Sequence, residues 1–103
     1  MKSDKWFNKS TDSLFNAILK LKSRDEAQRF FRDLLTEVEI EDFANRWKVA
    51  QMLSQNVSYS KIEKETGMST TTIARISKWL NEGMNGYRLI IKRLNHHPLP
   101  RAG

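Results

Sequence analysis

The sequence predicts an all-α protein, and three observations lead to this prediction. Apolar residues recur at helical spacing in several separate segments, and a residue able to cap a helix precedes most of them. No segment of useful length alternates apolar and polar residues as a half-buried strand would. Hydrophobic residues make up 39% and aromatic residues 10% of the 103 positions, which is enough for one core. We expect a single helical domain at residues 1–95 and a flexible tail at residues 96–103.

Two amphipathic helices are expected in the first third of the chain. The first runs from about Thr11 to Lys22, with candidate caps at residues 10–12. Its apolar face consists of Leu14, Phe15, Ile18 and Leu19. Ser23 and Glu26 have the spacing of a capping box, which predicts the start of the second helix. The apolar face of that helix consists of Ala27, Phe30, Phe31, Leu34 and Leu35.

A third helix is expected to start after Thr36, which repeats the capping-box spacing with Glu39, and to end at Asn56, which tolerates left-handed backbone. One apolar stripe of this helix consists of Ile40, Phe43, Ala44, Trp47 and Ala50. A second stripe consists of Val49, Met52 and Leu53. Two stripes need packing partners on more than one side, which a thin monomer could hardly supply. The sequence therefore predicts an obligate homodimer.

The whole chain has a net charge of +6, and its basic residues are concentrated in the second part. Residues 1–42 carry eight basic and nine acidic side chains, whereas residues 43–103 carry ten basic and three acidic ones. The second part should therefore attract polyanions, of which nucleic acid is the first candidate. Basic surfaces also occur on proteins that bind no nucleic acid, so a motif has to decide.

Residues 58–80 have the pattern of a helix-turn-helix. Ser58 can cap the first helix, Gly67 permits a positive φ in the turn, and Ser69 can cap the second helix. Apolar residues stand where the two helices would cross, namely Ile62, Met68, Ile73, Ile76 and Leu80. A last helix is marked by Tyr87, Ile90, Ile91 and Leu94. Six helices are therefore expected.

The second helix of this motif would present a polar face suited to the major groove. Short hydroxyl side chains at its tip can approach base edges, and cations one and two turns later can reach phosphates. The candidate DNA-binding residues are Ser60, Lys64, Ser69, Thr70, Thr71, Thr72, Arg75 and Lys78. The same geometry occurs in helical hairpins that never touch DNA. Two residues depart from the usual motif, since Glu63 stands at a position that is usually small and Thr66 at one that is usually apolar.

The chain resembles the Trp-repressor superfamily, and within it the YerC/YecD-type branch of small bacterial proteins, over residues 10–94. The resemblance rests on Leu34-Leu35-Thr36, the acidic helix with Arg46, Glu65-Thr66-Gly67, and Thr72-Ile73-Ala74-Arg75, in that order and spacing. It implies a six-helix Trp-repressor-like fold and an intertwined homodimer. In such a dimer the first three helices and the last helix of each subunit interleave, and two helix-turn-helix heads lie on the outside.

The resemblance also implies a candidate effector pocket formed by Arg46, Arg75 and Trp79. In the Trp repressor two arginines enclose the indole of the bound tryptophan, and Arg46 and Arg75 fall at matching positions. Ile76 and Trp79 replace a glycine and a serine of that pocket, so they would crowd an indole and remove a polar contact. We therefore predict that L-tryptophan is not the effector, while another small-molecule effector stays open.

The sequence predicts a sequence-specific transcriptional regulator, a repressor in the resembling family, that binds double-stranded DNA as a homodimer. The alternative from another class is a helical protein-interaction dimer that has lost specific DNA binding. Glu63 and the absence of the family's cations from the first helix of the motif favour this alternative. Salt-dependent duplex binding separates the two hypotheses. Single-stranded nucleic acid is disfavoured, because the aromatic residues lie on apolar stripes and not between exposed cations.

Other classes of function are also disfavoured. The absence of cysteine excludes disulfides and thiolate chemistry and fits the cytoplasm. No apolar run approaches the roughly 18 residues of a membrane span, so no membrane association is expected. His96 and His97 are adjacent and make a weak metal pair, so neither a metal nor a cofactor is predicted. The acidic residues at 37–42 suit a helix N-terminus and lack a partnering histidine, so no enzyme is expected.

Overall fold

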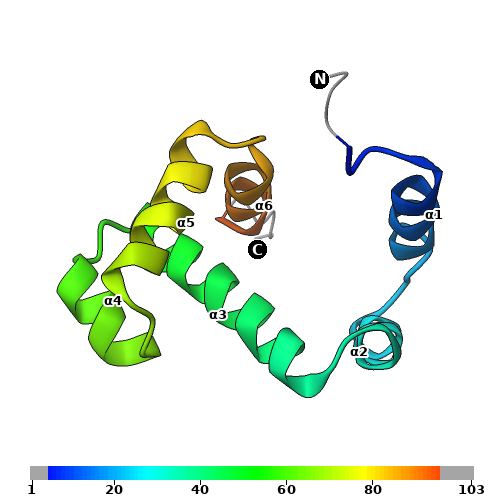
Figure 1. Ribbon diagram of the computed structural model, residues 1–103, viewed down its shortest axis with the longest axis horizontal. Coiled ribbons are helices and arrows are strands. Elements are labelled where there is room, and N and C mark those ends of the chain that lie inside the picture. Colours follow the sequence, from blue (N-terminus) through cyan, green and yellow to red (C-terminus); the bar gives the residue numbers. More distant parts are fainter. Residues whose placement is uncertain (1–4, 96–103) are drawn as a thin grey trace, which may run out of the picture. The chain divides into compact units, whose positions relative to one another are not determined.

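A computed structural model describes residues 5–95 of the chain as helices joined by short connections (Figure 1). The helices are α1 (Lys9–Ile18), α2 (Arg24–Leu34), α3 (Glu37–Ser54), α4 (Tyr59–Thr66), α5 (Thr70–Glu82) and α6 (Gly86–Asn95). No strand occurs within the described residues. The all-α prediction with its six helices is therefore confirmed. The expected tail at 96–103 lies outside the described residues.

The chain divides into two compact units, one up to Ile40 and one from Glu41 onward. The single domain expected at residues 1–95 stays a prediction. The first holds α1, α2 and the first turn of α3, and the second holds the rest of α3 together with α4, α5 and α6.

Helix α1 begins earlier and ends earlier than the sequence indicated. Asn8 is its cap, because the Asn8 Oδ1 accepts the Thr11 N–H at 3.0 Å and the Thr11 Oγ1 accepts the Asn8 N–H at 3.0 Å. Residues 10–12 therefore lie inside the first turn, where the Thr11 side chain completes the capping box of Asn8. At the other end the N–H groups of Lys20 and Leu21 bond to carbonyls only three residues back, which tightens the chain after Ile18.

The caps predicted for α2 and α3 are confirmed. The Ser23 Oγ accepts the Glu26 N–H at 3.1 Å, although the Glu26 carboxylate reaches back to the N–H of Lys22 and not to that of Ser23. Thr36 and Glu39 form a complete capping box, with hydrogen bonds of 2.9 and 3.1 Å between each side chain and the other's backbone N–H. Local hydrogen bonding thus fixes both helix starts.

The unit up to Ile40 has no buried residue in α1 or α2. Phe15 of α1 is 47% exposed, Leu19 just after α1 is 79% exposed, and Leu34 at the end of α2 is 47% exposed. The rings of Trp6 and Phe15 meet edge to face with their centroids 6.4 Å apart. Both helices are amphipathic, and the rest of their own unit leaves their apolar faces partly exposed.

The unit from Glu41 onward holds the core, and Figure 1 shows α4, α5 and α6 gathered around the C-terminal part of α3. Its fully buried residues are Val49 and Ala50 of α3, Ile62 of α4, and Ile73 and Ile76 of α5. Trp47 and Tyr87 stack beside this core with ring centroids 6.2 Å apart. The N-terminal part of α3 is different, since Phe43 remains 48% exposed. The core therefore serves mainly to hold α4 and α5 in place.

Candidate nucleic-acid interface

The turn between α4 and α5 is held by a glycine and a threonine hydroxyl. Gly67 has φ 74° and ψ 4°, the left-handed conformation, and its N–H bonds to the Glu63 carbonyl at 2.9 Å. The Thr66 Oγ1 donates to the Ile62 carbonyl at 2.7 Å and accepts the Met68 N–H at 3.2 Å. Thr66 stands where the motif usually has an apolar residue, and its hydroxyl makes hydrogen bonds in place of apolar contacts.

The start of α5 uses two of the predicted site residues as a cap. The Ser69 Oγ accepts the Thr72 N–H at 3.2 Å and donates to the Thr72 Oγ1 at 3.1 Å. Among the hydrogen bonds of residues 5–95, none uses the hydroxyl of Thr70 or Thr71, and both residues are exposed. Thr70 and Thr71 therefore have free hydroxyls, while those of Ser69 and Thr72 are engaged within the chain.

Helix α5 has a buried face and an opposite polar face. Ile73, Ile76 and Leu80 are buried at 0%, 1% and 5% exposure. At 100° per residue, Thr71, Arg75 and Lys78 lie on the opposite side of the helix, and all three are exposed. The ion pairs within residues 5–95 use neither Arg75 nor Lys78. The outer face of α5 thus presents two uncompensated cations and one free hydroxyl.

Helix α4 contributes a weaker charge. The predicted DNA-binding residues Ser60 and Lys64 are exposed, and Glu63 is exposed as well. The Lys61 ammonium lies 3.8 Å from the Glu65 carboxylate, so part of the charge of α4 is compensated within the helix. The Ser58 Oγ accepts the Lys61 N–H at 3.2 Å and caps α4 as predicted. Most of the free positive charge of the motif therefore lies on α5.

The residues of the candidate effector pocket have separate surroundings. The Arg46 guanidinium lies 5.6 Å from the ring centroid of Phe43 on its own helix. Burial raises the pKa of the Tyr87 hydroxyl, and the nearby charge of Arg46 opposes that shift only in part. Trp79 is 45% exposed, and no cation–π contact among the described residues joins it to Arg75. Ile76, in contrast, belongs to the core.

One contact between α6 and the second helix of the helix-turn-helix could not be predicted from the sequence. The Arg88 Nε donates to the Leu80 carbonyl at 2.9 Å, and the Arg88 Nη2 donates to the Asn81 Oδ1 at 2.6 Å. These bonds tie α6 to the end of α5 and satisfy a carbonyl that the helix leaves free. The partners are seven and eight residues apart, so only a three-dimensional arrangement brings them together.

Other kinds of site find no support in residues 5–95. No group of three histidine, cysteine, aspartate or glutamate side chains there could hold a metal ion. None of the helices in this part of the chain is both long and apolar enough to cross a membrane.

Two helices joined by a tight glycine turn, with one buried and one cationic face on the second, define a helix-turn-helix protein. Residues 9–95 match the model of the Trp repressor protein family, and the chain belongs to that family. It is 47% identical to the uncharacterized protein YerC of Bacillus subtilis over 94 residues. The aligned residues cover 91% of this chain and 90% of YerC. The predicted family resemblance is thereby confirmed.

Two solved structures share the fold. A TrpR-like protein from Eubacterium eligens superposes with a TM-score of 0.86 at 40% identity, over 93% of this chain and 99% of the other. A candidate Trp repressor from Staphylococcus aureus gives a TM-score of 0.85 at 39% identity, over 96% and 99% of the two chains. The chain therefore has the Trp-repressor-like fold, and its family is one of helix-turn-helix regulators of transcription, not of enzymes.

Proposed function

We propose that this protein binds double-stranded DNA in a sequence-specific manner as a homodimer and represses transcription. The observation that carries the proposal is the outer face of α5, where Thr71, Arg75 and Lys78 are exposed, free of ion pairs, and opposite the buried face. A capped helix with small residues at its tip and cations further along can enter the major groove.

Each candidate residue has a role in this proposal. Thr70 and Thr71 face base edges with hydroxyls that the chain leaves free. Arg75 and Lys78 each contact a phosphate. Ser69 and Thr72 act through the cap that fixes the tip of α5. The α4 residues Ser60 and Lys64 add contacts to the DNA backbone.

The homodimer is supported by apolar residues that lack cover within one chain. The unit up to Ile40 has no buried residue in α1 or α2, and Phe43 on α3 is 48% exposed. The α6 residues Ile90 and Leu94 are 42% and 54% exposed. An intertwined dimer, in which α1, α2, α3 and α6 of two copies interleave, would cover these faces. Its two α5 helices should lie about 34 Å apart, or a multiple of that, and select an inverted repeat.

The proposed regulator does not depend on L-tryptophan. Ile76 fills core volume at a position where the Trp repressor has a small residue, and Trp79 adds an indole one turn beyond Arg75. Arg46 and Arg75 alone do not rebuild the missing polar contact. Calorimetric titration with L-tryptophan should give no saturable heat, and duplex affinity should be the same with and without it. A different small-molecule effector is compatible with these residues.

The test of the proposed function is selection of bound duplexes from a random pool, followed by affinity measurement on the enriched sequence. We expect an enriched inverted repeat that binds the wild type and binds Arg75→Ala and Lys78→Ala more weakly. Lys48→Ala removes one exposed cation from α3 in the same unit and should leave the duplex affinity within about twofold of the wild-type value. Enrichment without any dyad, or equal loss in all three variants, would contradict the proposal.

A protein-interaction dimer without specific DNA binding is the second candidate. It is favoured by the exposed carboxylate of Glu63 and by the compensation of Lys61 by Glu65 on α4, which would face the DNA backbone. On this account the pool yields no enriched duplex while the dimer persists. Glu63→Gln would then leave the absence of DNA binding unchanged.

A further inference from the structure

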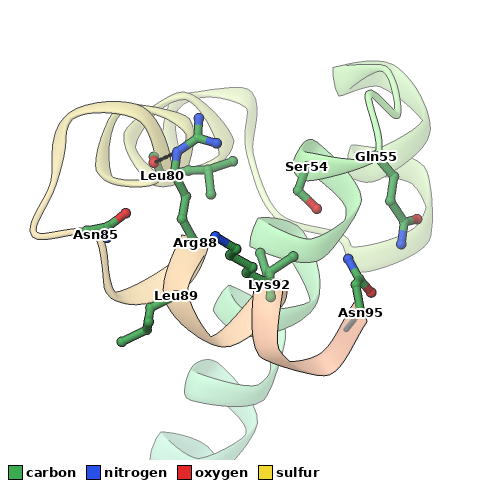
Figure 2. A pocket seen from close by; sticks show the side chains of 9 residues that line it. Ser54, Gln55, Leu80, Asn85, Arg88, Leu89, Lys92 and Asn95 are labelled. Carbon is green, nitrogen blue, oxygen red and sulfur yellow. Dashed lines mark hydrogen bonds between the residues drawn. The ribbon is translucent and has the colours of Figure 1, made fainter. Parts of the chain in front are cut away.

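A hollow of about 560 Å³ lies between the C-terminal ends of α3 and α5 and one side of α6 (Figure 2). All of its lining residues belong to the unit from Glu41 onward. Arg46, Arg75 and Trp79, the candidate effector residues, do not line it. The hollow is therefore distinct from the effector pocket that the family resemblance implies.

The lining of this hollow is cationic and polar. Arg88 and Lys92 lie one turn apart on α6, and none of the lining residues is acidic. Hydroxyl and amide groups come from Ser54, Gln55, Asn85 and Asn95, and apolar groups come from Leu80, Leu89 and Ile91. The ion pairs within residues 5–95 use neither cation. The hollow thus presents two positive charges that no carboxylate neutralises.

Arg88 is fixed in place without losing its charge. Its Nε and Nη2 donate to the Leu80 carbonyl and to the Asn81 Oδ1, and Figure 2 shows the first of these bonds. Both acceptors are uncharged, so the guanidinium stays a full cation, and its Nη1 has no partner among the hydrogen bonds of the described residues. A guanidinium that is already oriented loses little conformational entropy when an anion binds to its free edge.

The negative ends of two helices border the hollow, and donors of the chain bind some of their carbonyls. The Ser54 Oγ donates to the Gln51 carbonyl at 2.7 Å at the end of α3. The Gly83 N–H donates to the Trp79 carbonyl at 2.9 Å at the end of α5. A helix C-terminus carries about half a negative charge, so the two full charges of Arg88 and Lys92 outweigh those of the two helix ends.

The cationic side of α6 differs from its exposed apolar side. At 100° per residue, Arg88, Lys92 and Asn95 lie within about 60° of one another around the helix axis. Ile90 and Leu94, which are exposed, lie on the other side of the helix. A second copy of the chain that covers Ile90 and Leu94 would therefore contact a different side of α6 from the one that carries Arg88 and Lys92.

We propose that this hollow is a binding site for a small organic anion with two negative charges, held by Arg88 and Lys92. The apolar side chains among its lining residues fit a short hydrocarbon portion of the ligand, and the amides fit its remaining oxygens. A dicarboxylate and a phosphate monoester share this chemistry. The site lies at the C-terminal end of α5, about 18 Å along the helix from the Thr70 tip. It does not depend on the proposed DNA binding.

The test is a titration of the full-length, ¹⁵N-labelled protein, without DNA, followed by backbone amide chemical shifts. The probes are succinate, phenyl phosphate and, as the uncharged control, succinamide, all at constant ionic strength. We expect saturable shifts at Asn85, Arg88 and Lys92 with a dissociation constant of about 1 mM or tighter for at least one anion. Succinate alone would identify a dicarboxylate site, and phenyl phosphate alone a phosphate-ester site.

Two variants on α6 make the test specific. Lys92→Gln should weaken the binding about tenfold, which corresponds to the loss of one charge-assisted contact. Arg93→Gln removes the same charge from the neighbouring residue, which does not line the hollow, and should leave binding unchanged. The proposal is overturned if neither anion gives saturable shifts at about 10 mM. It is also overturned if the shifts lie elsewhere or if both variants lose binding equally.

Discussion

The two units of this chain contrast in what their apolar residues contact. From Glu41 onward, Val49, Ile62 and Ile73 are fully buried in a core that holds α4 and α5. Up to Ile40, α1 and α2 are equally well capped and amphipathic, yet neither has a buried residue. Capping is local and fixes where a helix begins, whereas burial needs packing partners.

This contrast assigns different tasks to the two units. The unit with the core can hold the outer face of α5 rigid by itself, as a surface that reads DNA requires. The unit without a core has apolar faces that only another surface can cover, and a second copy of the chain supplies it in the proposed dimer.

Ile73→Ala should lower the free energy of unfolding by about 2–5 kcal/mol, because it leaves a cavity in the fully buried core under α5. Urea denaturation followed by circular dichroism measures the loss. Leu19→Ala at the C-cap of α1, where the residue is 79% exposed, is the comparison and should cost much less stability. Equal losses in the two variants would remove the distinction between the units.

Phe15→Asp should dissociate the dimer, because it places a charge on an apolar face that the proposed partner covers. The loss of one buried phenyl ring, about 1.5–3 kcal/mol, weakens dimerisation by about 10- to 100-fold. Sedimentation at micromolar concentration measures the change. Ser13→Asp adds the same charge at an exposed polar residue of α1 and should leave the dimer intact. A wild type that sediments as a folded monomer would contradict the account.

Thr71→Ala and Thr72→Ala should have different effects, although both residues lie at the tip of α5. Thr71 has a free hydroxyl, so its loss should alter base preference by about 1–3 kcal/mol at one position of the site. Thr72 is bonded to Ser69, so its replacement should mainly lower stability. Competition binding against single-base variants of the selected duplex resolves the two. A shift in preference from Thr72→Ala alone would reverse these roles.

Gly67→Ala should lower the free energy of unfolding by about 1–2 kcal/mol. An added Cβ meets no atom within 4 Å, so only the left-handed φ of 74° is unfavourable. Gly86→Ala is the matched control, since its Cβ also meets no atom and its φ is not positive. That variant should be neutral or slightly stabilising in thermal denaturation. If both variants behave alike, the turn does not depend on its backbone conformation.

The sequence predicted those features that depend on neighbouring residues. The caps at Ser23, Ser58 and Ser69 and the left-handed Gly67 follow from side chains within three residues, and the structure confirms all four. The start of α1 was predicted wrongly because Asn8, an equally good cap, precedes the expected ones. Competing caps of similar strength are decided by which of them completes its hydrogen bonds.

Other features could not be predicted because they depend on tertiary contacts. Both apolar stripes of α3 were identified, but their sequence does not reveal that Val49 and Ala50 enter one core while Phe43 stays exposed. The site residues share a helix face that periodicity already indicated. The engagement of the Thr72 hydroxyl and the contact of Arg88 with α5 depend on rotamers and on the crossing of helices.

The most direct test of the central claim is the salt dependence of duplex binding by the wild type and by Arg75→Ala/Lys78→Ala. Fluorescence anisotropy with the selected duplex gives the affinity at several salt concentrations. We expect the logarithm of the affinity to fall linearly with the logarithm of salt concentration, and the double variant to lower the magnitude of this slope by about two. Lys48→Ala should leave the slope unchanged. An intact dimer with no duplex binding, or one slope for all three proteins, would contradict the assignment of the outer face of α5 as the DNA-reading surface.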